Sequence, residues 1–559
     1  MIPVEEDQED ALVTIIADGK AEGSFYVRLA ESEIDYEVPF DLTPYKGKNL
    51  ILDFKSGKKN NNGENKVRQS LGFENLSITE TFSTANREKS RPLYHHTPAY
   101  GWMNDPNGMF YKDGKWHLYY QWNPYGSKWQ NMTWGHSVSS DLINWEHLPA
   151  ALTPDALGAI FSGSAAVDHT GSAGFGKDAV VAMYTSAGHS QMQSIAHSSD
   201  NGTTFEVYAG NPVITLSTEA RDPKIFRNEK TGEWNMVLAH ALQHGVLFYS
   251  SPDLKNWTLN SEFGNEGATG GVWECPDLFE LEVEGTGEKK WVLIVNINPG
   301  GPFGGSATQY FIGDYDGKTF TPDKDENGEV PTKWMDYGKD HYATVTWSDA
   351  PDGRRVALGW MSNWEYADQV PTMQYRSANT LPRDLSLFRA DDGQVYLAGV
   401  PSPEVLKLRG KAVATSGKFN VGKSGRTFSL PKKNDGICEI AADLDVKKHG
   451  NVDLTLSNAD GEKVTISYDG SVLKFDRMHG TFTDISHHFP SVTEAPVFVK
   501  DGKISLRIFV DHGSVEVFSA DGKSVMTNLT FPENPYTTLT VSGNSAAVEN
   551  LKIYELIIK

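Results

Sequence analysis

The sequence predicts an all-β protein: a five-bladed β-propeller followed by a C-terminal β-sandwich, with a small N-terminal β-sandwich-like domain in front. Three observations support this fold. Long amphipathic helical patterns are scarce, and short apolar runs are bounded by Gly, Asp, Asn and Pro, as in β proteins. One turn-and-strand pattern recurs through the central part, and the pattern of strands changes after about residue 395. A chain of 559 residues also exceeds what one hydrophobic core can support.

The first expected domain spans residues 1–85. The runs VTIIADG, GSFYVRLA and NLILDFKS indicate strands, because they are rich in β-branched and aromatic residues. The tract KSGKKNNNGENK (55–66) is polar enough to predict a mobile loop.

The second expected domain, residues 86–395, contains an internal repeat. A polar turn with an Asp precedes an aromatic in SSDLINWEH (139–147), SSDNGTTFEV (198–207), SSPDLKNWTL (250–259) and DYDGKTFTP (314–322). The aromatics Trp145, Phe205, Trp257 and Phe320 are 60, 52 and 63 residues apart. Between them lie five similar apolar runs, each predicted to be the inner strand of a unit: KWHLYYQW (115–122), AVVAMYTSA (179–187), EWNMVLAH (233–240), KKWVLIVNI (289–297) and RRVALGWMS (354–362). Repeats of about 50–60 residues with several strands each are typical of propeller blades.

The third expected domain, residues 396–559, has alternating strands joined by short turns. VDLTLSNADGEKVTISYDGSVLKFD (452–476) and SLRIFVDHGSVEVFSADGK (505–523) are examples, with DG and HG turns between the strands. Hairpins of this kind predict an antiparallel sandwich.

Composition narrows the class of partner. The 51 Lys and Arg stand against 73 Asp and Glu, giving a net charge of −22. Nucleic acids and anionic membrane surfaces require basic patches, so neither is the expected partner. No window approaches the roughly 18 apolar residues of a membrane span, so no membrane insertion is expected. A neutral ligand agrees best with this charge, and 11% aromatic residues could serve sugar stacking or a β-rich core equally well.

The cysteines and the N-terminus say little about disulfides, metal binding or cellular location. Cys275 and Cys438 are too few for a disulfide framework or a zinc site. The opening MIPVEEDQED lacks the basic and apolar regions of a signal peptide, which leaves a cytoplasmic protein or a removed leader as alternatives.

Three acids occur in similar settings along the central region. Asp105 lies in NDPNG (104–108), Asp222 in ARDPKIF (220–226) and Glu274 in WECPDLF (273–279). A Pro follows Asp105 and Asp222 by one residue and Glu274 by two. Proline restricts its own backbone and that of the residue before it, so a stiff turn ahead of each inner strand is expected to aim the carboxylate at the propeller axis. Two carboxylates at one site suit hydrolysis of a glycosidic bond, and the neighbouring Arg221 could hold a carboxylate or sugar hydroxyls.

These motifs resemble those of glycoside hydrolase family 32, the invertase, inulinase and levanase family. The resemblance covers WMNDPNG, YQWNP, FSGSA, RDP, ECPD, GWMSNW and IFVDHGSVEVF, from about residue 90 to the end. It implies the propeller and sandwich together with retaining hydrolysis of terminal β-fructofuranosyl linkages in fructans or sucrose-type sugars. It implies no metal and no cofactor.

The resemblance also implies residue roles. Asp105 is expected to be the nucleophile, Glu274 the general acid/base, and Asp222 a stabiliser of the transition state through fructose hydroxyls. A retaining enzyme places the two reacting carboxyls about 5–5.5 Å apart. The expected walls of the fructose pocket are Asn104, Gln121, Trp129, Phe161, Ser162, Arg221 and Trp360. Phe161 stands where the family often has Trp, which affects subsite detail.

Other polar residues are assigned structural roles. His95, His96 and His136 are expected to be hydrogen-bonded structural histidines. Cys275 is expected to be a packing neighbour, and Asp511 and Glu516 belong to an ordinary half-buried strand. The N-terminal region is similar to extra domains of some bacterial members, and packing against the propeller is favoured over separate carbohydrate binding.

Several alternatives stay open at this stage. An exo-acting hydrolase is favoured, whereas an open cleft would give endo cleavage and a sugar acceptor would give fructosyl transfer. Loops such as SAGHSQMQ (186–193) decide between them. A fructan-binding propeller without catalysis would lack one or more of the three acids. An extracytoplasmic location is favoured because polymeric fructan is met outside the cytoplasm.

Overall fold

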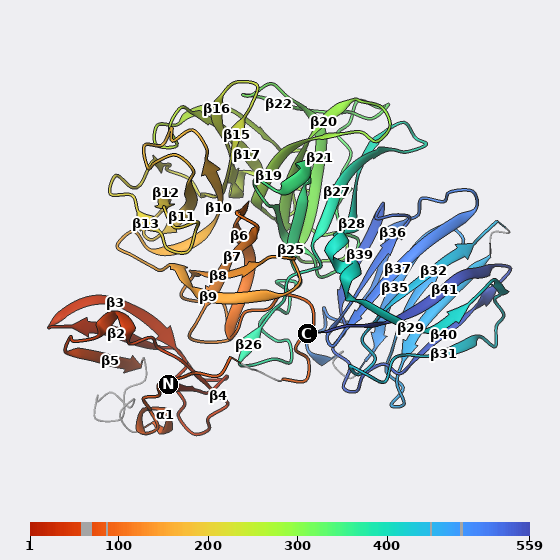
Figure 1. Cartoon of the computed structure of the whole chain (residues 1–559), viewed down its shortest axis with the longest axis horizontal. Helices are drawn as coiled ribbons and strands as arrows, with labels where there is room; N and C mark the ends of the chain where they lie inside the picture. The colour runs from red at the N-terminus through yellow and green to blue at the C-terminus, as the bar shows by residue number, and fades with distance from the viewer. Residues whose placement is uncertain (57–69, 85–87, 448–449, 481–483, 559) are drawn as a thin grey trace.

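The computed structural model describes residues 1–56, 70–84, 88–447, 450–480 and 484–558. Strands make up nearly all of the regular structure in these ranges. Figure 1 shows the N-terminal region beside the early strands of the central part, and the C-terminal strands on the other side of the molecule. The fold is all-β, as predicted, and its curled central part is propeller-like. None of the helices in the described ranges is long and apolar enough to cross a membrane.

The N-terminal region forms two small antiparallel sheets around one core. Its strands are β1 (Ile2–Val4) with β4 (Tyr36–Val38), and β3 (Lys20–Val27) with β2 (Ala11–Ala17) and β5 (Leu50–Ser56). The helices are η1 (Thr43–Tyr45) and α1 (Leu71–Glu74), whose first turn is capped by the Ser70 hydroxyl. The three predicted strands are therefore present. Most of the tract 55–66, predicted to be a loop, lies outside the described residues.

The core of this region extends onto the central domain. The ring of Phe25 stacks on Tyr125 of the central domain with centroids 4.0 Å apart. Tyr125 also packs against the apolar cluster formed by Val13, Phe54 and their neighbours. The N-terminal region is thus packed against the next domain through apolar contacts.

Between residues 101 and 401, all described, five antiparallel sheets follow one another along the chain. The first strands of successive sheets contact one another in a closed cycle, β6 to β10 to β15 to β19 to β24 and back to β6. These strands therefore line a common axis. The strands of the first two sheets are β6 (Gly101–Lys112), β7 (Lys115–Asn123), β8 (Thr133–Ser139), β9 (Trp145–Leu152), β10 (Ala159–Asp168), β11 (Ala179–Ala187), β12 (Gln191–Ser198), β13 (Glu206–Val207) and β14 (Ile214–Thr215).

The remaining sheets of the cycle repeat this plan. Their strands are β15 (Ala220–Asn228), β16 (Glu233–His240), β17 (Gly245–Ser251), β18 (Thr258–Gly264), β19 (Val272–Glu282), β20 (Lys289–Asn298), β21 (Ala307–Tyr315), β22 (Phe320–Pro322), β23 (Lys333–Trp334), β24 (Tyr342–Thr346), β25 (Val356–Trp360), β27 (Arg383–Arg389) and β28 (Val395–Pro401). The short strand β26 (Tyr375–Arg376) pairs with β6 in parallel. The 3-10 helices are η3 (Ala241–Gln243), η4 (Pro351–Gly353) and η5 (Pro403–Leu408).

One sequence prediction about the strands is wrong. The five apolar runs form β7, β11, β16, β20 and β25, which are the second strand of each sheet and not the innermost one. The innermost strands carry the polar motifs themselves, so NDPNG lies inside β6 and is not a turn ahead of a strand. Second strands are covered on both faces by neighbouring sheets, which explains why they have the longest apolar runs.

The predicted Asp turns are present in all four repeats. The Asp141 carboxylate accepts hydrogen bonds from the amides of Ile143 and Asn144, at 3.1 and 2.8 Å. Asp253 does the same for the amides of Lys255 and Asn256, at 3.0 and 2.8 Å. In the other two repeats Asp200 and Asp316 also accept backbone amides. The repeat in the sequence therefore encodes a side-chain-closed turn.

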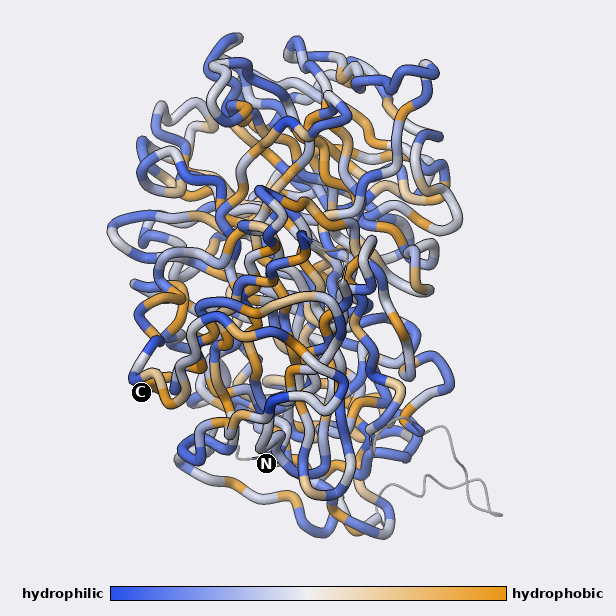
Figure 2. Tube along the Cα trace, turned by 90° about the vertical axis from the view of Figure 1, so that its right-hand side faces the viewer, coloured by the Kyte–Doolittle hydropathy of each residue, from blue (hydrophilic) through white to orange (hydrophobic). Residues whose placement is uncertain are grey.

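The C-terminal region consists of two antiparallel sheets whose inward side chains share one core. One sheet contains β29 (Arg409–Ser416), β41 (Ala547–Leu556), β32 (Cys438–Asp445), β37 (Lys503–Asp511), β38 (Ser514–Ser519), β39 (Ser524–Leu529) and β30 (Phe419–Asn420). The other contains β31 (Arg426–Ser429), β40 (Thr538–Asn544), β33 (Asn451–Ser457), β34 (Lys463–Tyr468), β35 (Val472–His479) and β36 (Val492–Pro496). Over the whole molecule, Figure 2 shows hydrophobic segments mostly in the interior and hydrophilic segments mostly at the outer turns.

A buried charged network joins this region to the central domain. The imidazole of His95 contacts Asp511 at 2.7 Å and Glu516 at 2.8 Å, and all three side chains are fully buried. Arg383 bonds Glu516 at 2.9 Å and Asp336 at 2.9 Å. Asp511 and Glu516 thus have partners across a domain interface.

Candidate active site

Each of the five innermost strands carries a β-bulge at the same level. Two residues of the inner strand stand opposite one of its neighbour between Met103 and Pro106, Ile160 and Gly163, Arg221 and Lys224, Glu274 and Asp277, and Tyr342 and Val345. A bulge bends its strand and re-aims the side chains beside it. The three predicted catalytic acids all lie in these bulges or directly at their edge.

The acids do not occupy the same position in their bulges, contrary to the matched positions predicted from the sequence. Glu274 is the last paired residue before its bulge, Asp222 is the first bulged residue, and Asp105 is the second. Asp222 adopts a left-handed backbone with φ of 64°, and Cys275 one of 45°. This one-residue stagger turns three carboxyls from three sheets toward one point.

Asp105 is held by two hydrogen-bond donors. The hydroxyl of Ser162 donates to Oδ2 at 2.6 Å, and the amide of Asn104 donates to Oδ1 at 3.0 Å. Both donors are buried. Because each carboxylate oxygen has its own donor, the orientation of Asp105 is fixed before any substrate arrives.

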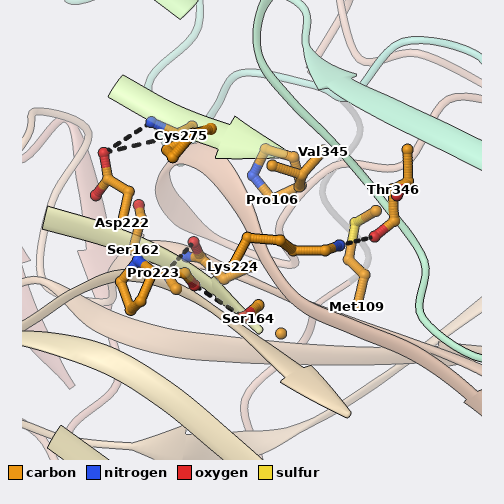
Figure 3. Close-up of a pocket in the computed structure, with 14 residues that line it drawn as sticks. Pro106, Met109, Ser162, Ser164, Asp222, Pro223, Lys224, Cys275, Val345 and Thr346 are labelled. Carbon is orange, nitrogen blue, oxygen red and sulfur yellow. Dashed lines mark hydrogen bonds between the residues drawn. The ribbon is translucent and has the colours of Figure 1, made fainter. Parts of the chain in front are cut away.

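Cys275 links two of the acids. Its backbone amide donates to Oδ2 of Asp222 at 2.9 Å, and its thiol lies 3.6 Å from the same oxygen and 3.5 Å from Oδ2 of Asp105. Figure 3 shows Asp222 and Cys275 joined in this way. Burial and the surrounding carboxylates raise the pKa of the Cys275 thiol well above its ordinary value. The thiol therefore acts as a weak hydrogen-bond donor, and not as a nucleophile.

Glu274 pairs with a guanidinium and a phenol. Arg221 donates to its Oε1 from Nε at 3.1 Å and from a terminal nitrogen at 3.0 Å. The hydroxyl of Tyr342 donates to the other oxygen, Oε2. Arg221 also contacts Glu219 at 3.2 Å. The arginine adjacent to Asp222 in sequence thus binds Glu274 of the neighbouring sheet.

The carboxyls influence one another's protonation. Burial, and then the charge of Glu274, raise the pKa of Asp105 to about 6. Burial is also the main cause that raises the pKa of Asp222; Arg221 opposes this, and Glu274 and Asp105 add to it. Closely spaced acids in a low-dielectric site are a common arrangement for proton transfer and nucleophilic attack.

The axis is closed on the inner side of the acids. Lys224 bonds the carbonyl of Thr346 at 2.5 Å and the carboxylate of Asp277 at 3.2 Å, and Pro106 and Val345 pack beside it (Figure 3). These residues enclose a space of about 10 Å³. That space is too small for a sugar, so a substrate reaches the acids from the opposite, open end.

Aromatic rings surround the open end. Trp129 is 44% exposed and packs edge-on against Phe161 at a centroid distance of 5.8 Å. Trp364, which is partly exposed, stacks at 5.6 Å on the fully buried Trp102 behind it, and the indole of Trp102 donates to Asn104 at 2.8 Å. Large flat side chains with one polar atom suit the apolar and polar faces of a sugar ring.

Two of the predicted pocket residues lie behind this wall. Trp360 has no exposed surface and packs against Trp364 at 4.8 Å and Tyr342 at 6.4 Å. Gln121 is buried and donates to the carbonyl of Ile160 at 3.0 Å, at the start of the second bulge. Both support the site from behind, whereas Asn104, Ser162 and Arg221 contact the acids directly.

Some residues of the site were not identified from the sequence. Tyr342 lies in a strand without a recognisable motif, and only its pairing register places it level with Glu274. Trp102 and Trp364 belong to the motifs WMNDPNG and GWMSNW, which do not by themselves predict a place in the pocket for these two residues. Their position beside Asn104 could have been inferred only from the three-dimensional arrangement.

The histidines have hydrogen-bond partners. His96 bonds Asn379 at 2.7 Å and Ser137 at 2.9 Å, and His136 lies 3.2 Å from His117. Among the described residues, no group of three or more His, Cys, Asp or Glu side chains is arranged to hold a metal ion. Cys275 and Cys438 are both buried and free.

Comparison with protein families adds an independent finding. Residues 95–398 match the family described as glycosyl hydrolases family 32 N-terminal domain, and residues 404–555 match the family 32 C-terminal domain. Residues 1–94 match a domain of unknown function, DUF4980.

Individual relatives share most of the chain. A levanase of Bacillus subtilis is 45% identical over 507 residues, which cover 86% of this chain and 73% of the relative. An extracellular exo-inulinase of Aspergillus niger is 36% identical, covering 83% and 93%. Among solved structures, the exo-inulinase of Aspergillus awamori has a TM-score of 0.77 at 33% identity, covering 85% of this chain and all of the other. The fructofuranosidase of Schwanniomyces occidentalis complexed with fructose also has a TM-score of 0.77 at 33% identity, covering 86% and 100%.

Proposed function

The chain belongs to glycosyl hydrolase family 32, and we propose that it removes terminal fructosyl units by double displacement, with Asp105 as nucleophile and Glu274 as general acid/base. As a member of this family it is a glycoside hydrolase that releases fructose from fructans or sucrose-type sugars. The single observation that carries the proposed roles is the convergence of three carboxyls at staggered bulge positions, each with its own hydrogen-bond partners.

The first step needs an ionised nucleophile. Asp105 attacks the anomeric carbon of fructose while Glu274 gives a proton to the leaving oxygen, so the glycosidic bond breaks and a fructosyl ester forms. The hydroxyl of Ser162 and the amide of Asn104 hold the attacking carboxylate in place.

The second step reverses these roles. Glu274 takes a proton from water, the water oxygen attacks the anomeric carbon, and the ester bond to Asp105 breaks, which restores the enzyme. Asp222, whose carboxylate is fixed by the amide of Cys275, accepts hydrogen bonds from fructose hydroxyls that strengthen as positive charge develops on the ring.

The architecture proposed for this activity is a five-bladed propeller with a C-terminal sandwich. The closed cycle of innermost strands supports five blades, and the shared core of the two C-terminal sheets supports a sandwich. We place the domains at residues 1–85, 86–395 and 396–559.

Exo action on a polymer is the proposed mode, because the axis is closed on the inner side of the acids and the relatives include named exo-inulinases. The same relatives are described as extracellular, which supports an extracytoplasmic location for this chain.

The test is a product profile on inulin, levan, kestose and sucrose, followed by chromatography from the earliest time points. We expect fructose alone. A ladder of oligosaccharides would instead indicate endo cleavage, and lengthened products would indicate transfer. Asp105→Asn and Glu274→Gln are expected to lower kcat by at least about 1,000-fold, while still binding substrate. Full activity of either variant would refute the assigned roles.

A further inference from the structure

A cleft lies between the N-terminal domain and the first sheet of the central domain. Its volume is about 590 Å³, within the range of about 300–1,000 Å³ that is typical of small-molecule sites. Gln8, Glu9 and Asp10 line it from the N-terminal domain, and Trp102 and Trp129 from the central domain. The two domains therefore build this cavity together.

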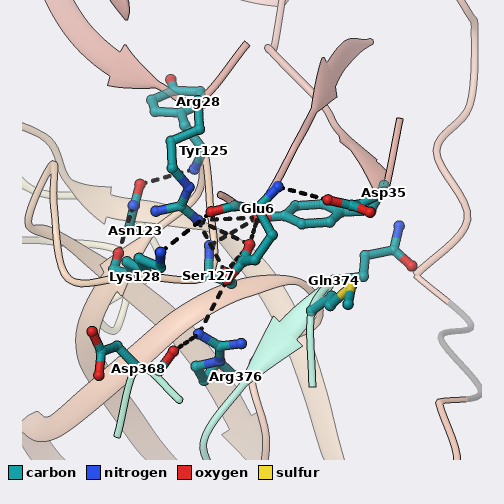
Figure 4. A network of polar contacts seen from close by, with 12 residues as sticks. Glu6, Arg28, Asp35, Asn123, Tyr125, Ser127, Lys128, Asp368, Gln374 and Arg376 are labelled. Carbon is teal, nitrogen blue, oxygen red and sulfur yellow. Dashed lines mark hydrogen bonds and ion pairs between the residues drawn. The ribbon is translucent and has the colours of Figure 1, made fainter. Parts of the chain in front are cut away.

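The N-terminal side of the cleft is rigidly attached. Asn131 of the central domain bonds both the amide and the carbonyl of Tyr26, each at 2.8 Å. Below the cleft, buried Arg28 bonds Glu6 at 3.0 Å and Ser127 at 3.1 Å (Figure 4). Because backbone and buried ionic contacts fix the domain, the cleft exists before a ligand binds.

Arg376 of the central domain strengthens the same attachment. Its guanidinium lies 3.2 Å from Oε1 of Glu6, and its backbone belongs to β26, which pairs with β6. The strand that carries Asp105 is therefore tied to the N-terminal domain through one short strand and one ion pair.

The cleft lies beside the catalytic site. Trp102 is fully buried in the wall of the cleft, and its indole donates to Asn104, whose amide donates to Asp105. Trp129, also in the cleft, packs against Phe161, the residue before Ser162. Two side chains thus separate the wall of the cleft from the proposed nucleophile.

The chemistry of the cleft suits a neutral, hydroxyl-rich chain. Tyr26 is 43% exposed and Trp129 is 44% exposed, so each domain presents an aromatic ring to the cleft. Glu9, Asp10 and Asp368 supply carboxylates that can accept hydrogen bonds from hydroxyls.

Among the described residues, three carboxylates line the cleft against two cations, and only one of these cations, Arg28, pairs with a carboxylate. Arg28 pairs with the Glu6 carboxylate, and the ammonium of Lys128 bonds the Glu6 carbonyl at 3.3 Å. An anionic ligand would meet the three carboxylates of Glu9, Asp10 and Asp368, whose repulsion opposes its binding. A sugar chain avoids this conflict.

We propose that the N-terminal domain forms the binding region for the leaving portion of the substrate, so that Tyr26 and Trp129 hold the fructosyl units beyond the scissile bond. This proposal depends on the proposed function and assigns the domain a role in selecting fructan chains over sucrose. Sucrose presents one sugar ring beyond the scissile bond, whereas a longer chain reaches the rings on both sides of the cleft.

The experiment compares wild type, Tyr26→Ala and Ile51→Ala. Ile51 is 50% exposed on β5 of the same domain and does not line the cleft, so Ile51→Ala is the matched control. The ratio of kcat/KM on an inulin-type oligosaccharide of five units to that on sucrose is expected to fall about tenfold in Tyr26→Ala, chiefly through KM. The control variant keeps the wild-type ratio. Thermal unfolding of both variants shows whether the domain remains folded.

A second measurement separates binding from catalysis. Titration calorimetry with the same oligosaccharide on Asp105→Asn and on the double variant Asp105→Asn/Tyr26→Ala is expected to show about tenfold weaker binding by the double variant. An unchanged ratio and unchanged binding would overturn the proposal while fructose release by the wild type leaves the proposed function intact. Failure of the wild type to release fructose from any substrate would instead overturn the proposed function, and this proposal with it.

Discussion

At the residue scale, the orientation of each carboxyl is set by its position relative to a β-bulge. Glu274 precedes its bulge, while Asp222 and Asp105 lie within theirs at successive positions. In an ordinary strand, side chains alternate between the two faces of the sheet, and a bulge interrupts this alternation. A shift of one residue along the chain therefore changes the direction of a side chain strongly. The prolines that follow the acids restrict the backbone further.

Tyr342 is expected to position the acid/base through its hydroxyl. Removing a donor to a partly buried carboxylate costs about 1.5–3 kcal/mol, so Tyr342→Phe is predicted to lower kcat by about 10- to 100-fold. The variant should bind substrate nearly as well as the wild type, since the ring remains. Steady-state kinetics on sucrose measure both quantities. Tyr119→Phe is the control, because it removes a buried hydroxyl bonded to Gly202 outside the site. Equal losses in the two variants would argue against a positioning role.

Activity should decline on the acid side as Asp105 becomes protonated. Burial and Glu274 raise the pKa of Asp105 to about 6, and only its ionised form can attack. We therefore predict that kcat/KM falls as the pH drops below about 6, roughly tenfold per pH unit. The hydroxyl of Ser162 lowers this pKa, so Ser162→Ala should move the acid limb to higher pH. A profile that stays flat down to pH 4, or one that Ser162→Ala does not shift, would contradict this assignment.

At the scale of elements, the Asp turns are the repeated unit of the central domain. Asp253 accepts two backbone amides and one side-chain amide, from Lys255 and Asn256. Asp253→Ala leaves these donors to solvent and is predicted to lower the free energy of unfolding by about 1–2 kcal/mol. Asp253→Asn keeps an oxygen acceptor and should lose less. Urea denaturation followed by fluorescence measures both. A loss as large in the Asn variant as in the Ala variant would show that charge, and not turn closure, matters.

The sequence predicts where the strands lie along the chain. It does not predict which strand of each sheet lies nearest the axis. The run KKWVLIVNI (289–297) predicted a strand and forms β20, Lys289–Asn298. Its apolarity predicts an inner strand, yet the innermost strand of this sheet is β19, which carries the polar motif WECPDLF. The composition of NDPNG predicts a turn, whereas tertiary pairing with β7 holds it in a bulged strand. Gly108, with φ of 54°, lets the rings of Tyr119 and Trp134 approach this strand closely.

The candidate site could be predicted only where the chemistry is local. Asp105, Asp222 and Glu274 stand in recognisable motifs, and the structure brings the three together. Tyr342 and the cleft with the N-terminal domain depend on contacts between residues far apart in the chain. Such contacts leave no pattern in one sequence, because spacing along the chain carries no information about register between sheets.

At the scale of the whole molecule, a buried ionic network unites the central and C-terminal regions. His95 stands between Asp511 and Glu516, and Arg383 neutralises Glu516 from the other side. Burial opposes the charge on His95, but its two carboxylate partners prevail and raise its pKa to about 9. Removing one partner of such a buried group leaves an uncompensated charge, which costs about 3–5 kcal/mol.

The stability of this interface should depend on pH. A histidine with a raised pKa in the folded state stabilises fully below its ordinary value of 6.5, and the contribution is lost as the pH rises through about 9. Glu516, whose pKa is lowered to about 2, contributes above its ordinary value of 4.5 and loses this as the pH falls. The network is therefore most effective between these two ordinary values. His95→Gln is predicted to reduce the free energy of unfolding by about 3 kcal/mol at pH 6, and by clearly less at pH 9.5.

Denaturant unfolding at the two pH values tests this prediction, with His96→Gln as the matched control. His96 is also buried, but burial lowers its pKa to about 3, and it is bonded to Asn379 and Ser137. It stays neutral throughout, so its replacement should cost the same at both pH values. A cost for His95→Gln that does not change with pH would mean that the imidazole is neutral in the folded protein.

The five bulges lie at the same level along the axis but carry different side chains. Three of them present an acid, whereas the bulge of β10 holds Phe161 and Ser162, and that of β24 holds Ala343 and Thr344. Every sheet thus brings a bulge toward the axis, and the side chains at the bulges differ from one sheet to the next. The pairing of the sheets therefore does not dictate which side chains stand at the bulges, which makes the ring of bulges a natural starting point for redesign.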